Sequence, residues 1–324
     1  MVRSAWCAAI VLAGLGPGAC TFREPIRPEA EVRFSTRRPE SLPARLPIAL
    51  TRQDPFLFVN ARVNGQDAGL FLLDTGSTLN IIGQGVAARL HLPSSGRGTV
   101  IGIGGEERFT YRRIQSLSVA GLDLEHRVLA SLNLHRFTRP LGVPVNGVLG
   151  CRAFQSLPIT IDYESATLTI HRPGSFRGPV DVPAVPLVSY AGLPSVEAEV
   201  GKAHRVWLVL DTGAHVHVTL PLSCARKWPD IVAVAATGPR RSIGVGGRVG
   251  GMHAWLSSLR IFGCDLSGVP VTFDASGPEE GGAEPVIGRV GNGLLKSFIL
   301  TLAPQEGLVW AQPRDAKGAA PPAP

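Results

Sequence analysis

The chain has 324 residues, which is long enough to bury a large core and predicts two domains, although one large β domain is also compatible with this length. Its 38 glycines and 27 prolines, with many short runs of Val, Ile and Leu, favour an all-β protein with many turns over a helical one. Only 18% of the residues are charged, and the formal net charge of +7 comes from scattered basic residues without interleaved aromatic side chains, which argues against charge-rich disorder and a nucleic-acid partner.

Residues 1–20 have the features of an export signal. Arg3 precedes an apolar stretch over residues 5–15, and small residues follow up to Cys20. The stretch is too short and too broken by Gly and Pro to span a bilayer as a mature helix. The small residues before Cys20 resemble the lipobox of bacterial lipoproteins, in which that Cys carries the lipid. Two alternatives therefore stay open, lipidation at Cys20 or ordinary cleavage near Ala19, and both predict an exported protein, either periplasmic or anchored to the outer membrane.

The rest of the chain is expected to consist of a linker, two domains of similar length and a short tail. Residues 21–45 are rich in Pro and Arg without a period, which indicates a linker or tether, with a short propeptide as the alternative. Five prolines between residues 173 and 194 mark a boundary, so we expect one domain over 46–179 and another over 180–312. Residues 313–324 form a polar Ala/Pro tail that we expect to be disordered.

An internal repeat begins in the first of these domains. The apolar run at residues 70–73 ends in Asp74-Thr75-Gly76-Ser77, and the run at 206–210 ends in Asp211-Thr212-Gly213-Ala214. Each pattern predicts a core strand that stops where Gly permits unusual backbone angles, which leaves an Asp at the strand end. One such Asp is compatible with a turn acid that satisfies its own backbone. Two in a repeat indicate a pair of carboxylates that meet.

The repeat extends on both sides of the acids. A shift of the sequence by 137 residues aligns residues 55–77 with 192–214 without a gap, and Asn64-Gly65 predicts a hairpin turn within the first copy. Further matches are short strands at Ile81-Ile82 and Val218-Thr219, glycine-rich segments at 101–105 and 243–247, and Val148-Leu149-Gly150 with Val286-Ile287-Gly288; a helical turn is expected over residues 84–90. Several motifs in the same order indicate a duplicated unit.

This ordered set of motifs resembles the pepsin/retropepsin clan of aspartic proteases, and specifically its retropepsin-like branch, over residues 46–310. The resemblance implies two closed, retropepsin-like β-barrel lobes related by a pseudo-twofold axis, with both halves in one monomeric chain. It implies that Asp74 and Asp211 are the catalytic pair of an endopeptidase. Paired carboxylates share a proton, so one Asp activates a water and the other assists the substrate carbonyl without a metal or cofactor.

The resemblance also implies roles for the residues around the pair. Thr75 and Thr212 would hydrogen-bond across the junction of the lobes, and Gly76 and Gly213 would let backbone N–H groups approach the carboxylates. Ser77 would donate to Asp74, which Ala214 cannot do for Asp211. The segments predicted to form substrate-binding flaps are Ile101, Gly102, Ile103, Gly104 and Gly105, and Ile243, Gly244, Val245, Gly246 and Gly247. We expect the first flap to be a true hairpin, the second to be looser, and the substrate to be a peptide or protein with apolar side chains beside the scissile bond.

Other interpretations of the same residues lead to different functions. The main alternative is a non-catalytic peptide- or envelope-binding protein on the same fold, in which the acids are turn residues; the two intact Asp-Thr-Gly triplets favour catalysis. His215 and His217 alternate on a predicted strand, and without a third ligand at suitable spacing they predict no metal site. Cys151, Cys224 and Cys264 are odd in number and widely spaced, which predicts neither a disulfide framework nor a metal centre.

Overall fold

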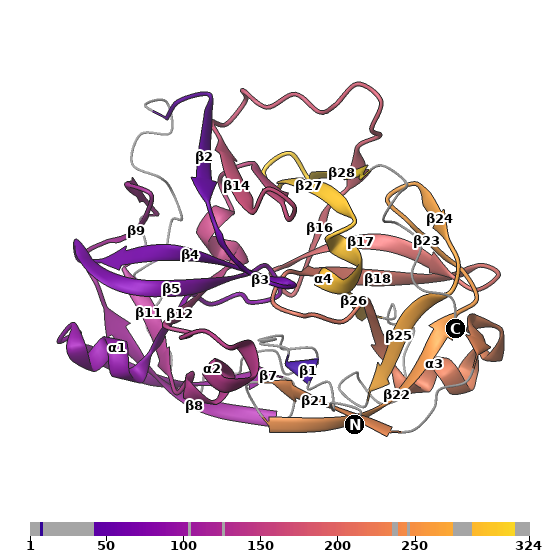
Figure 1. The fold of residues 1–324 in the computed structure, drawn as a ribbon, viewed down its shortest axis with the longest axis horizontal. Helices are drawn as coiled ribbons and strands as arrows, with labels where there is room; N and C mark the ends of the chain where they lie inside the picture. Colours follow the sequence, from indigo (N-terminus) through magenta and orange to yellow (C-terminus); the bar gives the residue numbers. More distant parts are fainter. Residues whose placement is uncertain are drawn as a thin grey trace.

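The computed structural model describes residues 7–8, 42–102, 105–124, 127–234, 239–244, 247–274 and 287–314. Within these ranges the chain is mostly β-sheet, as predicted (Figure 1). The helices are short: α1 (Gln84–Arg89), α2 (His135–Leu141), α3 (Leu222–Lys227), α4 (Asn292–Leu295) and the 3-10 turns η2 (Cys151–Phe154) and η3 (Pro229–Ile231). No helix in the described ranges is both long and apolar enough to cross a membrane. The predicted residues Cys20, Ile103, Gly104, Val245 and Gly246 lie outside them.

The first sheet has ten strands, all from the first half of the chain, and it lies on the left of Figure 1. They are β3 (Thr51–Gln53), β4 (Phe56–Val63), β5 (Gln66–Asp74), β6 (Ile81–Gly83), β7 (Ser94–Gly102), β8 (Gly105–Arg113), β9 (Leu117–Val119), β10 (Leu122–Asp123), β11 (Val128–Leu132) and β12 (Gly147–Gly150). Along the sheet their order is β10-β9-β4-β5-β12-β6-β11-β8-β7, and β3 pairs with β4. The acid-bearing strand β5 is therefore internal.

The second sheet has twelve strands and lies on the right of Figure 1. They are β1 (Cys7–Ala8), β16 (Val188–Tyr190), β17 (Leu193–Val200), β18 (His204–Asp211), β19 (Val218–Pro221), β20 (Val232–Val234), β21 (Pro239–Gly244), β22 (Gly247–Leu256), β23 (Leu259–Ile261), β24 (Cys264–Leu266), β25 (Val269–Asp274) and β26 (Ile287–Gly291). Apart from β1, which pairs with β21, they all come from the second half. The second acid-bearing strand, β18, lies between β17 and β26.

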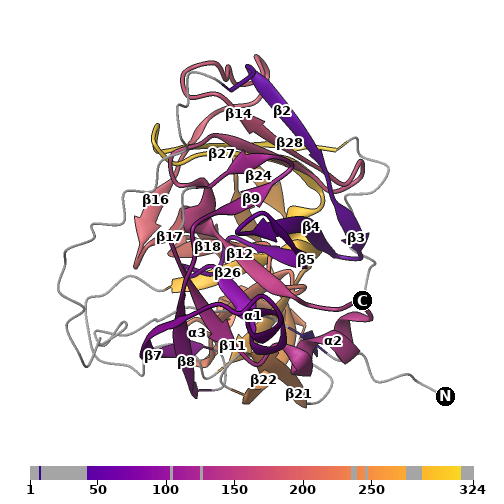
Figure 2. The same cartoon turned by 90° about the vertical axis from the view of Figure 1, so that its left-hand side faces the viewer.

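A third sheet of six strands combines both halves of the chain and lies above the other two sheets in Figures 1 and 2. Its strands are β2 (Arg45–Ala49), β13 (Ile159–Asp162), β14 (Thr167–His171), β15 (Val185–Pro186), β27 (Phe298–Ala303) and β28 (Leu308–Pro313). At its centre β13 pairs with β27, where Thr160 lies opposite Thr301 and their hydroxyl oxygens are 2.7 Å apart. The interpretation of the sequence as two separate domains did not include this sheet.

Local sequence signals account for the strands that carry the acids. The predicted turn at Asn64-Gly65 is confirmed, because both residues have positive φ (51° and 74°) and join β4 to β5. The side-chain oxygen of Asn64 also accepts the backbone N–H groups of Gln115 and Ser116, which fixes the turn against the next part of the sheet. Helix α1 follows β6, as the predicted helical turn required.

The register around the two acids corrects one predicted match. In the parallel pair of β5 and β12, Asp74 lies opposite Gly150, and in the parallel pair of β18 and β26, Asp211 lies opposite Gly291. Gly150 therefore corresponds to Gly291, and the predicted match to Gly288 is wrong by three residues. Strand β26 contains two glycines, Gly288 after Ile287 and Gly291 after Val290. The sequence pattern favoured Gly288, the earlier of the two.

The apolar core extends through all three sheets. One cluster of buried side chains includes Leu73, Leu210 and Leu302, which come from the first, second and third sheets respectively. A second cluster is confined to the first half and includes Phe58, Leu72 and Val148. Because these residues follow the alternation of the strands, the strand ends that carry the acids are held between packed layers.

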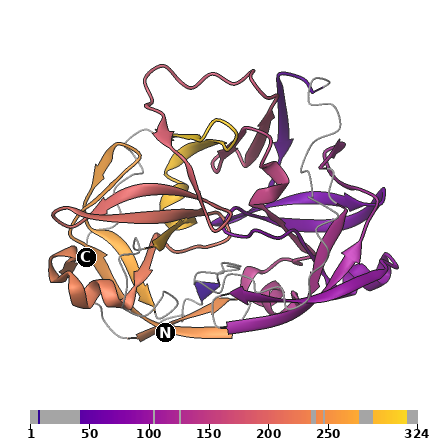
Figure 3. The same cartoon turned by 180° about the vertical axis from the view of Figure 1, so that it is seen from behind.

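Both segments predicted as flaps belong to regular hairpins. β7 pairs with β8 from Ser94 to Gly102, and β21 pairs with β22 over six successive residue pairs that begin at Pro239 and end at Gly244. The pairing of the first hairpin has one register shift, between Ser94 and Gly96, and that of the second has none. The expectation that the second is looser stays a prediction, because the residues at both turns lie outside the described ranges. The two hairpins lie at the same end of the molecule, opposite the third sheet (Figures 1 and 3).

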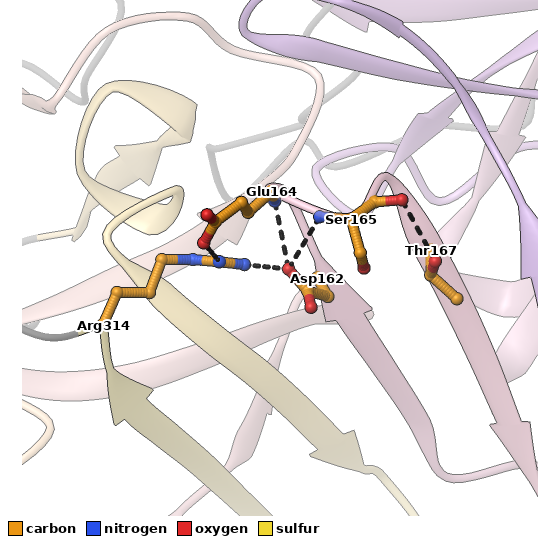
Figure 4. A network of polar contacts seen from close by, with 5 residues as sticks. All are labelled: Asp162, Glu164, Ser165, Thr167 and Arg314. Atoms are coloured by element: carbon orange, nitrogen blue, oxygen red, sulfur yellow. Dashed lines mark hydrogen bonds and ion pairs between the residues drawn. The ribbon is translucent and has the colours of Figure 1, made fainter.

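The ordered chain extends beyond its predicted end. Strand β28 reaches Pro313, and the guanidinium of Arg314 donates hydrogen bonds to Asp162 and Glu164 at the turn after β13 (Figure 4). Asp162 also accepts the backbone N–H of Glu164 at 3.0 Å. Residues 313 and 314 are thus part of the third sheet and its contacts, which corrects their assignment to a disordered tail.

Replacing Arg314 by Met is expected to destabilise this sheet. Asp162 and Glu164 lose the charged partner of their hydrogen bonds. A partly exposed network of this kind contributes about 1 kcal/mol to stability, so we expect a Tm that is lower by a few degrees. Burial alone would raise the pKa of Asp162, but hydrogen bonds from Arg314 and Ser165 outweigh it and lower this pKa. The stabilisation is therefore present above the ordinary pKa of Asp and is lost as the pH falls through the lowered pKa.

Thermal unfolding at several pH values checks this expectation. A matched control is Arg205→Met, which removes an arginine whose side chain is 80% exposed and paired with Glu197. The control is expected to leave Tm within about 1 °C. Equal Tm values for the Arg314 variant and the wild type near neutral pH would contradict a stabilising role.

Candidate active site

The two acids occupy corresponding positions at the ends of buried strands. Asp74 is the last residue of β5 and Asp211 is the last residue of β18, and both side chains are completely buried. Each strand end is fixed by the chain that follows the neighbouring parallel strand: the N–H of Cys151 donates to the carbonyl oxygen of Ser77, and that of Asn292 donates to Ala214. The same local contacts thus position both acid-bearing loops.

Four hydrogen bonds join the two loops directly. The N–H of Thr75 donates to Oγ1 of Thr212 at 2.9 Å, and the N–H of Thr212 donates to Oγ1 of Thr75 at 3.1 Å. The hydroxyl of Thr75 donates in turn to the carbonyl oxygen of Leu210 at 2.5 Å, and that of Thr212 to Leu73 at 2.8 Å. Each threonine therefore binds the strand that carries the opposite acid, as the resemblance implied, and the two loops cannot move independently.

The carboxylates lie over the glycines of the opposite loop. A Cβ atom added to Gly76 would be 2.4 Å from Cγ of Asp211, and one added to Gly213 would be 2.3 Å from Cγ of Asp74. Such distances are far below van der Waals contact, so only glycine fits at both positions. The reciprocal contacts bring the two acids to a single location between the loops, although 137 residues separate them in the sequence.

Burial raises the pKa of both carboxyl groups, and at Asp74 the charge of Asp211 raises it further. For Asp74 burial is the largest cause, the charge of Asp211 is the second, and together they hold its pKa well above the ordinary range. Burial also raises the pKa of Asp211, to about 6, against the opposing effects of Arg289 and of the N–H groups of Gly213 and Ala214. The pair therefore holds a proton at pH values where an isolated Asp is fully ionised.

Several oxygens of the pair face no protein donor. Within the described residues, both carboxyl oxygens of Asp74 and Oδ2 of Asp211 lack a hydrogen-bond partner, whereas Oδ1 of Asp211 accepts the N–H of Gly213 at 3.0 Å. Buried polar groups without partners are uncommon in folded proteins and concentrate where a protein handles a reactant. These oxygens are thus placed to bind water or a carbonyl group.

The first loop differs from the expected arrangement at Ser77. Its hydroxyl donates to the carbonyl oxygen of Leu79 at 2.8 Å and accepts the N–H of the same residue at 3.2 Å. A hydroxyl has one proton, so the expected donation to Asp74 does not occur in this structure. Ser77 stabilises the turn after the acid, and Ala214 occupies the corresponding place in the second loop, 1% exposed.

Sequence reasoning did not identify Arg289 as part of the site. This side chain is 5% exposed, and its Nε lies 3.9 Å from Oδ2 of Asp211. The signal was present in the sequence, because an arginine between Gly288 and Val290 interrupts a short apolar strand. A charge in such a strand requires a buried partner, and the neighbouring strand supplies Asp211.

A second network that the sequence did not indicate supports the loop of Asp211. The hydroxyl of Tyr163 donates to Oδ1 of Asn292 at 2.6 Å, and Nδ2 of Asn292 donates to the carbonyl oxygen of Thr212 at 2.7 Å. Tyr163 and Asn292 are buried at 5% and 0% exposure. Tyr163, in the turn after β13, and Asn292, the first residue of α4, thereby hold the backbone beside the second acid.

The remaining predicted residues lie in the two hairpins and in the loop after β18. Gly102 and Gly105 flank the turn of the first flap hairpin, and Gly244 and Gly247 flank that of the second. His215 and His217 lie in the loop before β19 and not on a strand, which corrects that expectation, and burial lowers the pKa of His217 to about 4. The described ranges contain no group of three or more His, Cys, Asp or Glu side chains arranged for a metal, and Cys151, Cys224 and Cys264 have free thiols.

Comparison with known proteins supports the same class of site. Residues 59–153 match a family model described as aspartyl protease. This stretch includes Asp74, the first glycine-rich segment and Gly150, whereas Asp211 lies outside it. No curated protein sequence matches the chain. The match supports an aspartyl protease family and, in general terms, peptide hydrolysis.

Proposed function

We propose that the protein is an aspartic endopeptidase in which Asp74 and Asp211 activate a water between them. The observation that carries this proposal is the reciprocal placement of two buried carboxyl groups, each over the glycine of the opposite loop and each with a raised pKa. A water oxygen attacks the carbonyl carbon of the peptide bond while one carboxylate takes its proton and the other carboxyl protonates the carbonyl oxygen. As the resulting diol collapses and the C–N bond breaks, the carboxyl that took the water's proton gives it to the leaving amine, and a diol hydroxyl returns a proton to the other carboxylate.

The proposed substrate is an extended peptide segment. Strand β7 of the hairpin β7–β8 ends its sheet and offers backbone groups with which a peptide strand can pair, so that its register is set by main-chain hydrogen bonds. In the second hairpin, β21 pairs with β1, which lies in the proposed leader, so removal of the leader would free the same groups there. The apolar residues Ile101 and Ile243 near the hairpin turns favour apolar side chains beside the scissile bond. Each half of the chain is proposed to form one closed, retropepsin-like lobe of a duplicated unit, so the active species is a monomer.

The location of the protein is a separate proposal that rests on the sequence alone. An apolar leader that ends in small residues before Cys20 favours export, with a lipid at Cys20 or an ordinary cleavage near Ala19. Mass spectrometry of the mature N-terminus distinguishes a lipid-modified Cys20 from an unmodified terminus, and a retained leader would contradict export.

Incubation of the purified protein with an unfolded protein substrate tests the enzymatic proposal. New peptide termini detected by mass spectrometry are expected to accumulate linearly with time and to disappear with a statine-containing peptide, which imitates the tetrahedral diol. Saturable peptide binding without new termini, over pH 4–8, would instead support the non-catalytic binding protein. Activity confined to a dimer in light scattering would argue against a complete site within one chain.

A further inference from the structure

Arg289 makes the two halves of the site unlike each other. It lies two residues before Gly291 in β26, and the corresponding residue of the first half is Val148, two residues before Gly150 in β12. Val148 is fully buried in the apolar cluster of the first half. Arg289 is 4% exposed, so a positive charge occupies the place where the first half has a methyl-bearing side chain.

The geometry directs this charge toward Asp211. In the parallel pair of β18 and β26, Arg289 lies opposite Val209, two residues before Asp211, and residues two apart on a strand share a face of the sheet. The Nε to Oδ2 distance is 3.9 Å. Within the described residues, Nε has no hydrogen-bond acceptor and Asp211 is the carboxylate within ion-pair distance. A buried charge of this kind is retained where a partner compensates it.

Other titratable groups near the pair keep their protons in the working pH range. Tyr163, at the turn after β13, has a raised pKa because of burial and the charge of Asp211. Burial raises the pKa of Cys151, at the start of η2, to about 12. Arg289 is the cation that lowers the pKa of both acids. At Asp211 it is the largest of the effects that lower the pKa. At Asp74 it lowers the pKa by less than the charge of Asp211 raises it.

We propose that Arg289 is a positioning residue that holds the negative charge of the pair on Asp211 and leaves the proton on Asp74. This inference rests on the proposed peptidase function and assigns the two roles within it. Asp211 accepts the proton of the attacking water, and Asp74 donates its proton to the carbonyl oxygen of the substrate. A symmetric pair would distribute these roles equally; the charge of Arg289, together with the N–H of Gly213 that donates to Asp211, favours the negative charge on Asp211.

The pH profile of kcat/KM tests the role of Arg289. In the wild type, kcat/KM is expected to rise with pH as Asp211 ionises, near pH 6, and to fall at higher pH as Asp74 loses its proton. Removal of an opposite charge within this distance raises a carboxyl pKa by about 1–3 units. Arg289→Met is therefore expected to move the acid limb upward by at least about one pH unit, with about tenfold lower kcat/KM on that limb.

Two variants serve as controls for this test. Arg289→Lys keeps the positive charge and is expected to keep the acid limb within about 0.5 pH units of the wild type. Arg205→Met removes an exposed arginine of β18 and is expected to leave the limb unchanged. Arg289→Gln, which keeps a polar side chain of similar length, replaces the Met variant if the latter does not fold. A uniform loss of kcat/KM with an unmoved acid limb in the Met and Gln variants would overturn the proposal.

An NMR titration separates this inference from the peptidase function itself. With 13C-labelled aspartate and the Asp211 signal assigned through Asp211→Asn, the carboxyl of Asp211 is expected to titrate at higher pH in Arg289→Met than in the wild type. This shift requires no catalysis. If the Asp211 titration shifts in a protein that has no peptidase activity, the proposed function is refuted and the coupling of Arg289 to Asp211 is retained. If the titration does not shift, the coupling is refuted.

Discussion

Replacing Asp74 by Asn is expected to lower kcat/KM by at least about a thousandfold and to raise the thermal stability at neutral pH. The loss of activity follows because an amide cannot donate the acidic proton that the mechanism requires, and general acid–base groups contribute about 10²–10⁴ in rate. Asp211→Asn is expected to cause a similar loss, since an amide cannot accept the proton of the water. Both variants keep the size of the side chain, so the loops joined by Thr75 and Thr212 remain in place.

The gain in stability follows from the direction of the pKa shifts. Both carboxyl groups have a raised pKa in the folded protein, so their contribution to stability is complete below the ordinary pKa of Asp and is lost as the pH rises through the raised values. An Asn at position 74 avoids this loss. We therefore expect Tm to exceed that of the wild type by a few degrees near pH 8, with a difference that shrinks toward pH 4.

Measurements of Tm against pH and of peptide cleavage in the same samples check both effects. Asp181→Asn is a matched control, because Asp181 is exposed and outside the site, and it is expected to change neither quantity. Full cleavage activity in both Asn variants of the pair would refute the mechanism. A lower Tm at every pH for Asp74→Asn would refute the account of the buried carboxyl groups as destabilising.

Replacing Gly76 by Ala is expected to abolish activity through a different cause. The added methyl group would lie 2.4 Å from Cγ and 2.5 Å from Oδ1 of Asp211, so the carboxylate or the loop must move. A displacement of 1 Å at a catalytic pair is sufficient for a loss of about a hundredfold, and overpacking of this kind also lowers stability by about 1–3 kcal/mol. Gly213→Ala, with the same relation to Asp74, is expected to behave alike.

Cleavage assays on both alanine variants, with circular dichroism to establish folding, check this expectation. Gly85→Ala is the matched control, because no atom lies within 4 Å of its added Cβ and its residue is in α1, where Ala is favoured over Gly. The control is expected to retain activity and to gain slightly in stability. Activity within threefold of the wild type for Gly76→Ala would show that the two loops are farther apart than the structure places them.

The sequence predicted the strands that carry the acids because their signals are local. An alternating apolar pattern, an Asn-Gly turn and a Gly after the acid each restrict the backbone within a few residues, and the positive φ values of Asn64 and Gly65 bear this out. The repeat added the relation between Asp74 and Asp211, which no single copy contains. The contact between the two loops was then implied by the resemblance.

The features that the sequence did not predict depend on distant partners. Strands β13 and β27 are individually ordinary, and nothing local indicates that Thr160 pairs with Thr301. The register of β26 was assigned three residues early because Arg289 breaks the apolar pattern on which the match relied. Its role becomes visible only when the parallel pairing sets this strand beside β18, two residues from the level of Asp211.

The six-stranded sheet also has a consequence for how the molecule folds and unfolds. It combines β2 from the beginning of the folded chain, β13 and β14 from its middle, and β27 and β28 from its end. Its central pairing closes loops of more than a hundred residues, and contacts so distant in sequence slow folding. Neither half carries this sheet alone. A cut between residues 179 and 180 would therefore leave two fragments with unpaired β13 and β27 edges.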